Sequence, residues 1–212
     1  MIKDKITPEL ESKFQDAINK TKENGEEHGF YLCSAKKELS ELSPSELRLG
    51  KDRRINLGNP VTACHGKKVQ GNFHTHSYFT LFKQKSKLMK QGKSDEDIKK
   101  FIKEKHGEHI KTSGVKGITL DSPSPKDLLT SILYSCIGKP EGIMCVGSDM
   151  GNNKVECWVP KEILRADCDR AYRSLYDNGK EKEMITYESW MTPLFHKEII
   201  DLKKRDKQGG NI

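Results

Sequence analysis

The sequence predicts an α+β domain, in which helices flank a central β-sheet. Three observations lead to this fold class. The chain of 212 residues is long enough for one domain with elaborations. Apolar runs of strand length are bounded by turn-forming residues, and longer segments repeat apolar residues at helical spacing. The chain shows no internal repeat.

The first predicted helix covers residues 8–22. Thr7 is placed to cap it, Pro8 takes its first position, and Phe14 and Ile18 recur at helical spacing. Strand-like runs follow at residues 29–33, 46–49, 54–57, 61–64 and 68–76. Further helices are predicted at 80–90, 94–105, 161–178 and 185–204, another begins at Ser124-Pro125, a short strand covers 115–120, and a hairpin joins 142–147 to 154–159.

Composition restricts the environment of the chain. Apolar residues make up 33% and charged residues another 33%, which predicts a modest core. No apolar run approaches the roughly 18–20 residues of a membrane span, so we expect no membrane association. Residues 1–5 lead into no apolar segment, and we therefore expect no signal peptide and a cytoplasmic protein.

The six cysteines lie in apolar surroundings, and none forms a C-x-x-C pair. We interpret them as buried thiols in a reducing compartment rather than as disulfides. They are Cys33, Cys64, Cys136, Cys145, Cys157 and Cys168.

The net charge of +7 is unevenly distributed, because residues 83–105 hold nine lysines against four acidic residues. A basic segment can attract nucleic acid or an acidic protein. Among these lysines only Phe101 could stack on a base, which disfavours a nucleic-acid partner and favours a solvated helix face.

The most informative segment is the predicted strand 68–76, which ends in His74-Thr75-His76. Alternate side chains of a strand point to opposite faces of the sheet. His74 and His76 therefore share one face, while Phe73 and Thr75 share the other. Two histidines on one face of a strand have the geometry of two ligands of one zinc ion.

A third ligand is available at the start of the helix that begins at Ser124-Pro125. Ser124 is placed as its N-cap, and Asp127 is its third residue. The apolar side of this helix would fix both residues against the core. Ser-x-x-Asp is also a common capping arrangement, so these residues taken alone could serve only to cap the helix.

Together these pieces resemble the JAMM motif of the JAB/MPN metalloprotease family, which has a glutamate upstream, then His-[Ser/Thr]-His, then Ser-x-x-Asp. The family's glutamate usually precedes a glycine by three positions. Here that glycine is Gly29, so the resemblance selects Glu26, with Glu27 as the reserve choice. The resemblance covers roughly residues 8–160, apart from a long insertion.

The resemblance implies an MPN-type fold, similar to cytidine deaminases, with a central mixed sheet. It implies that His74, His76 and Asp127 bind Zn²⁺, that Glu26 is the general base and that Ser124 donates to the oxyanion. The implied reaction is hydrolysis of an amide or isopeptide bond, as in deubiquitinases. The implied substrate is a ubiquitin-like protein or its conjugate, and the implied partner is an MPN-type protein or a second copy of the chain.

The chain departs from the family pattern in two ways. Residues 77–123, a stretch of 47, separate His76 from Ser124, where the family has a short segment. Ser77 also replaces a frequent proline. A long insertion costs little if its ends remain close. We therefore predict a catalytic domain over residues 1–160, in which a lysine-rich helical hairpin is inserted, and a C-terminal helical extension over 161–212.

Two other functions were compared with the hydrolase. A zinc deaminase would need H-x-E and P-C-x-x-C, and the sequence has neither. A non-catalytic MPN-like scaffold or partner-binding module is the main alternative. Inactive family members generally lose metal ligands, whereas this chain keeps the whole pattern, which favours catalysis.

Overall fold

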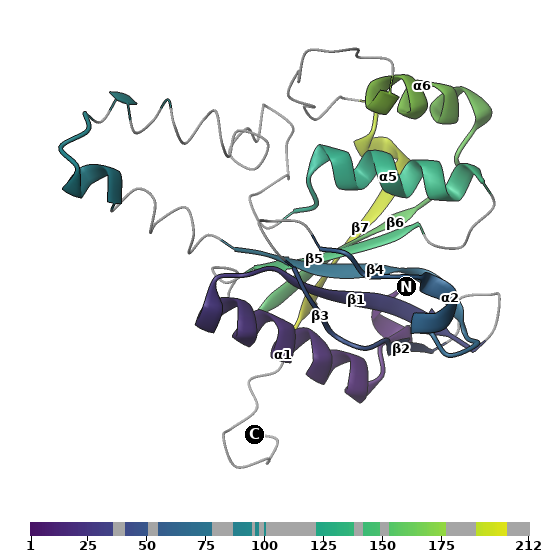
Figure 1. The fold of residues 1–212 in the computed structure, drawn as a ribbon. Coiled ribbons are helices and arrows are strands. Elements are labelled where there is room, and N and C mark those ends of the chain that lie inside the picture. Colours follow the sequence, from purple (N-terminus) through teal and green to yellow (C-terminus); the bar gives the residue numbers. More distant parts are fainter. Residues whose placement is uncertain are drawn as a thin grey trace.

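The computed structural model describes residues 1–35, 41–50, 55–77, 87–94, 96–97, 100, 122–137, 142–148, 153–176 and 190–202. These residues form an α+β domain with a seven-stranded mixed sheet and helices on both faces (Figure 1). The predicted fold class is confirmed at this level.

The helices are α1 (Pro8–Asn24), α2 (Pro60–Ala63), α5 (Pro125–Cys136) and α6 (Arg165–Tyr176), with short 3-10 helices η1 (Lys3–Lys5) and η2 (Thr192–Leu194). The strands are β1 (His28–Ser34), β2 (Leu42–Pro44), β3 (Arg48–Leu49), β4 (Lys68–His76), β5 (Ile143–Ser148), β6 (Lys154–Pro160) and β7 (Phe195–Asp201). The strand order is β2-β1-β4-β5-β6-β7, and β3 also pairs with β1. Only the β4–β5 pair is parallel among these strands.

Helix α1 covers one face of the sheet (Figure 1). Its start follows the predicted signals, since Thr7 Oγ1 accepts the Leu10 N–H and a proline occupies the first turn. Between α1 and the sheet, the rings of Phe14, Phe30 and Phe73 are fully buried, with centroids 4.7–5.7 Å apart. Phe73 therefore points toward α1, and His74, the next residue of β4, points to the opposite face.

Helix α5 covers that opposite face, and α6 packs on the side of α5 that is turned away from the sheet (Figure 1). Their core includes Leu128, Leu129 and Ile132 of α5, which pack with Trp158 of β6 and Ala171 of α6. This packing holds the N-terminal end of α5 over the end of β4, because the sequence makes one side of α5 apolar.

Two predicted elements are wrong. Residues 61–64 were expected to form a strand, but α2 occupies them, since Asn59 Oδ1 accepts the Val61 N–H as an N-cap and Pro60 starts a helical turn. Residues 185–204 were expected to be helical, but Phe195–Asp201 is β7, which pairs along its whole length with β6. The sheet therefore extends past residue 160, and the described part of the C-terminal extension is not wholly helical.

A third predicted element is also wrong, because residues 55–57 of the strand expected at 54–57 are described and form no strand. The inserted segment lies largely outside the described residues, as does the predicted strand at 115–120. Residues 87–90 are helical. Ser94 Oγ accepts the Asp97 N–H at 3.1 Å, so Ser94 caps the start of the helix that is predicted at 94–105.

All six cysteines form disulfides, which corrects their interpretation as thiols. The pairs are Cys33–Cys64, Cys136–Cys168 and Cys145–Cys157. The partners are 31, 32 and 12 residues apart, so their proximity arises from the tertiary fold and leaves no short motif. Disulfides are typical of oxidising compartments and of hyperthermophile proteins. The disulfides argue against an ordinary cytoplasmic location. The cytoplasmic location expected from the sequence therefore stays a prediction.

Removing the Cys136–Cys168 disulfide should destabilise the protein. This bond joins the end of α5 to α6 and closes a loop of 32 residues, so its loss should cost about 3 kcal/mol. Urea unfolding of Cys136→Ser/Cys168→Ser against the unreduced parent measures this. An unchanged free energy of unfolding, or free thiols in the parent after purification without reductant, would contradict the assignment.

Within the part of the chain that the structure describes, no helix combines the length and apolar character needed to cross a membrane.

Candidate metal centre

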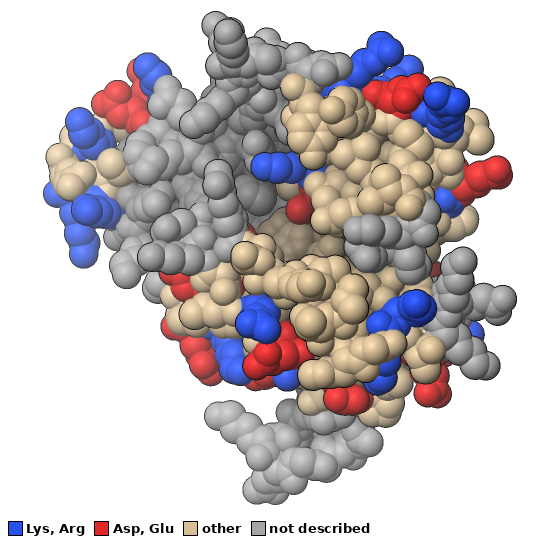
Figure 2. Space-filling view, turned by 45° about the vertical axis from the view of Figure 1, so that its right-hand side comes forward, with Lys and Arg blue, Asp and Glu red and all other residues tan. Residues whose placement is uncertain are grey.

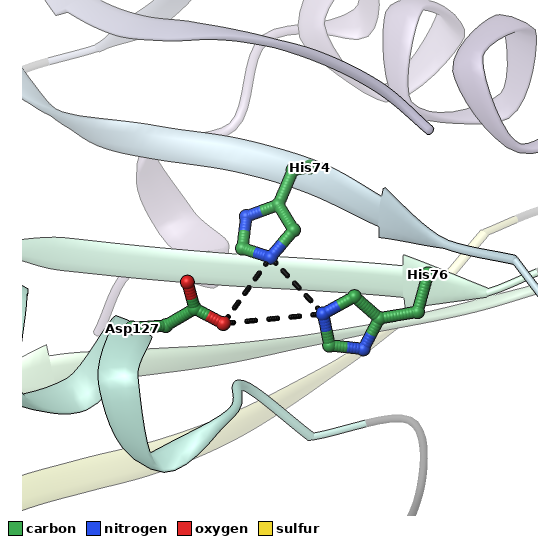
Figure 3. Close-up of side chains that lie close together, drawn as sticks. All are labelled: His74, His76 and Asp127. Carbon is green, nitrogen blue, oxygen red and sulfur yellow. Dashed lines mark hydrogen bonds and ion pairs between the residues drawn. The ribbon is translucent and has the colours of Figure 1, made fainter. Parts of the chain in front are cut away.

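Three side chains from two elements meet above the sheet. His74 and His76 stand at the end of β4, and Asp127 extends from the first turn of α5 (Figure 3). All three point toward one another (Figure 3). Asp127 is fixed by a capping box, in which its Oδ2 accepts the Ser124 N–H at 2.8 Å and Ser124 Oγ accepts the Asp127 N–H.

The distances among these atoms fit one tetrahedral metal ion. The two Nε2 atoms lie 3.1 Å apart, and Asp127 Oδ2 lies 3.4 Å from His74 Nε2 and 3.9 Å from His76 Nε2. Bonds of about 2.0–2.1 Å at tetrahedral angles place neighbouring ligand atoms about 3.3 Å apart. Two imidazoles and one carboxylate are the donor types of a three-ligand catalytic zinc site, which keeps a fourth position open.

The three ligands differ in exposure. The side chains of His74 and His76 are 8% and 6% exposed, whereas that of Asp127 is 26% exposed. The cluster can therefore be reached from the α5 side. The space-filling view shows a hollow in the middle of one face, between the part of the molecule around α1 and the part around α5 and α6 (Figure 2). Basic and acidic side chains are interspersed around this face.

In the metal-free cluster, Asp127 and His74 shift each other's pKa values. Burial alone would raise the pKa of Asp127, but the neighbouring His74 and His76 outweigh burial and hold that pKa well below its usual range. Burial likewise tends to lower the pKa of His74, but the charge and hydrogen bond of Asp127, with the charge of Glu27, raise it overall. Without metal, the charges of Asp127 and Glu27 therefore favour a proton on His74.

Metal affinity is therefore expected to depend on pH. A cation must displace the proton from His74, so zinc affinity should fall as the pH decreases from about 8 to about 6, and binding should release protons. Calorimetry in buffers of different ionisation enthalpy measures the release. Affinity that is constant over this range would show that His74 does not bind the metal.

The stability of the metal-free protein should have a matching pH window. The His74 pKa is raised above 6.5, so its contribution is complete below pH 6.5 and is lost as the pH rises through the raised pKa. The Asp127 pKa is lowered below 3.8, so its contribution is present above that pH and is lost as the pH falls through the lowered pKa. Thermal unfolding in EDTA should therefore show a decline toward alkaline pH that zinc reverses.

The structure brings Glu27, and not Glu26, toward the cluster. In the antiparallel β1–β4 pair, Gly29 lies opposite His74, and continuing this register by two positions brings Glu27 opposite His76. Glu27 is 8% exposed and its charge acts on His74, whereas Glu26 is exposed. Alternation alone separates Glu27 from Glu26, and the packing of Phe30 against α1 shows that Glu27 lies on the side of the histidines.

The backbone around Glu27 is hydrogen-bonded on one side and closely packed against β4 on the other. The Gly50 N–H donates to the Glu27 carbonyl at 2.7 Å, so the segment after β3 fixes one edge. On the other edge, Gly29 leaves room for the histidine, since a Cβ at this position would lie 2.6 Å from the Phe73 carbonyl oxygen and 3.2 Å from His74 Cβ. Glycine is therefore required beside the first ligand.

Ser124 lies beside Asp127, as predicted. It is 7% exposed, and its hydroxyl helps to lower the Asp127 pKa. Its capping role is evident from the hydrogen bonds, and its role toward an oxyanion stays a prediction. Sequence reasoning missed Ser148, which β5 places beside His76 and which is fully buried.

The insertion begins and ends at the cluster. His76 and Asp127 flank residues 77–123 closely in sequence, and their ligand atoms are 3.9 Å apart. The separation of the ligands in sequence therefore does not separate them in space.

No protein-family model matches this chain, and a search of curated proteins finds no match either.

Proposed function

We propose that this chain is a zinc-dependent metallopeptidase or isopeptidase of the JAMM type, with an MPN-type fold. The observation that carries the proposal is the convergence of His74, His76 and Asp127 on one point, although 47 residues separate the strand from the helix. The buried Glu27 on the same face, beside this point, adds a group that can transfer protons.

Each residue then has a defined task. His74, His76 and Asp127 would hold zinc, which supplies Lewis-acid chemistry that makes water a nucleophile near neutral pH and polarises a carbonyl. Glu27 accepts the proton of the attacking water and returns it to the departing amine. We prefer Glu27 to Glu26 for this task because of its burial and position. Ser124, at the N-cap beside Asp127, donates to the developing oxyanion.

The substrate class follows from this chemistry and from the family resemblance. The proposed substrate is an amide or isopeptide bond at the C-terminus of a ubiquitin-like protein or of its conjugate. An extended tail is suited to a partly exposed cluster, and Asp127 is the most exposed of the three ligands. An MPN-type protein or a second copy of the chain is the proposed partner.

Metal analysis combined with a cleavage assay tests the proposal. We expect about one zinc per chain and cleavage of at least one member of a panel of ubiquitin-like fusions and conjugates, abolished by chelation and restored by zinc. The disulfides should be kept intact by omitting reductant. Less than about 0.2 zinc per chain after zinc is supplied would contradict the proposal. Full zinc content without cleavage of any substrate would favour the scaffold alternative.

A further inference from the structure

A buried hydroxyl cluster lies on the face of the sheet opposite the metal ligands. Its centre is Thr75, which stands between His74 and His76 and is fully buried. Thr75 Oγ1 lies 2.6 Å from Oγ1 of Thr21, which is also fully buried, near the end of α1. Thr21 Oγ1 lies 3.1 Å from Nδ1 of His28. Helix α1, β1 and β4 thus each contribute one side chain.

Thr75 also replaces backbone pairing at a particular point. The regular pairing of β1 with β4 ends where Gly29 lies opposite His74. One position further, the His28 N–H donates to Thr75 Oγ1 at 2.8 Å, and this hydroxyl lies 3.3 Å from the His28 carbonyl oxygen. A side chain of β4 therefore continues the connection between the strands toward the metal cluster.

The neighbours of these residues make the connection relevant to the site. Thr75 separates the two histidine ligands, and His28 directly follows Glu27. The hydrogen bond from the His28 N–H to Thr75 Oγ1 therefore fixes the distance from the ligand-bearing end of β4 to the backbone next to Glu27. Thr21 prevents this end of the sheet from moving relative to α1. Such supporting groups can change metal affinity without contacting the metal.

We propose that Thr75, supported by Thr21 and His28, is a positioning residue for the metal cluster and for Glu27. The part of the inference that concerns Glu27 rests on the proposed function. Its hydrogen bonds, however, can be tested by metal affinity alone. The alternative is that the hydroxyls only satisfy buried polar groups, in which case their removal would reduce stability in the same way as any other core change.

Thr75→Val and Thr75→Ser form the main comparison, because valine keeps the shape and removes the hydroxyl while serine keeps the hydroxyl. Zinc affinity is measured by chelator competition on folded protein, and the visible spectrum of the Co²⁺-loaded protein reports ligand geometry. We expect Thr75→Val to lose about 10- to 100-fold in zinc affinity and to change the spectrum. Thr75→Ser should remain within about threefold of the parent.

Two further variants separate positioning from general destabilisation. Leu10→Ala removes a buried side chain three turns before Thr21 on α1 and should lower the melting temperature without changing zinc affinity. Thr21→Val should weaken zinc binding less than Thr75→Val. The double variant should be no weaker than Thr75→Val alone, because both changes break the same connection.

The outcomes are distinct. Zinc affinity of Thr75→Val within about twofold of the parent, or an equal loss in Leu10→Ala at an equal melting temperature, would overturn the positioning role. A parent that binds no zinc would overturn both this inference and the proposed function. A parent that binds zinc but cleaves no amide contradicts the proposed function only, and the affinity ratios then still decide the role of Thr75.

Discussion

Glu27→Gln is expected to lower kcat/KM for amide or isopeptide cleavage by about 10²–10⁴-fold and to leave zinc binding intact, because glutamine cannot accept the proton of the attacking water. The residue is buried beside the cluster and acts electrostatically on His74. Glutamine keeps the size of the side chain, so the fold should be retained. Steady-state kinetics and zinc analysis of the same preparation measure the two effects.

Glu26→Gln is the matched control. It makes the identical chemical change one residue earlier, at an exposed position whose backbone carbonyl lies 2.9 Å from His28 Nδ1. Its kcat/KM should stay within about twofold of the parent, since Glu26 is exposed and, unlike Glu27, is not among the charges that act on His74. If Glu26→Gln loses activity and Glu27→Gln does not, the assignment made from strand parity is wrong.

Asp127→Asn is expected to reduce zinc affinity by more than about a hundredfold, because changes in groups that only orient a ligand already cost about 10- to 100-fold. The asparagine Oδ1 can still accept the Ser124 N–H, so the start of α5 should form as before. Chelator competition measures the affinity. Urea unfolding of the metal-free protein at about pH 8 should differ from the parent by no more than about 1 kcal/mol.

Ser124→Ala provides the complementary result. It removes the hydroxyl that accepts the Asp127 N–H and should cost about 1 kcal/mol of stability, while all three ligands remain. Zinc content should therefore stay near that of the parent. Should both variants lose stability equally and both keep zinc, Asp127 would act only as a helix cap and the metal centre would have to lie elsewhere.

Strand β4 shows how far local sequence patterns can lead. Its bounds and its two faces were predicted from the sequence, since alternate side chains of a strand point to opposite faces of the sheet. The start of α5 was equally predictable, because Ser124-Pro125 and Asp127 carry a capping pattern. The same reasoning failed at β7. Residues 195–201 have apolar side chains at helical spacing, but pairing with β6 decides their conformation.

The disulfides and the general base show a different limit. The cysteine partners lie on separate elements, so only the packing of α5 on α6 and the pairing of β5 with β6 bring two of the pairs together. Parity places Glu26 and Glu27 on opposite sides, but the pairing of β1 with β4 is needed to show which of them accompanies the histidines. The family resemblance instead favoured a fixed spacing before Gly29.

Local sequence patterns were enough to predict the chemical groups at the site: two histidines on one strand face, and a carboxylate in the first turn of a capped helix. These are local properties, because backbone geometry sets which neighbouring side chains share a face. Only the tertiary structure decided that Asp127 meets the histidines, that Glu27 accompanies them and that Thr75 joins β4 to β1 behind them. Contacts between elements far apart in the chain depend on how their apolar faces pack, and no local pattern encodes that packing.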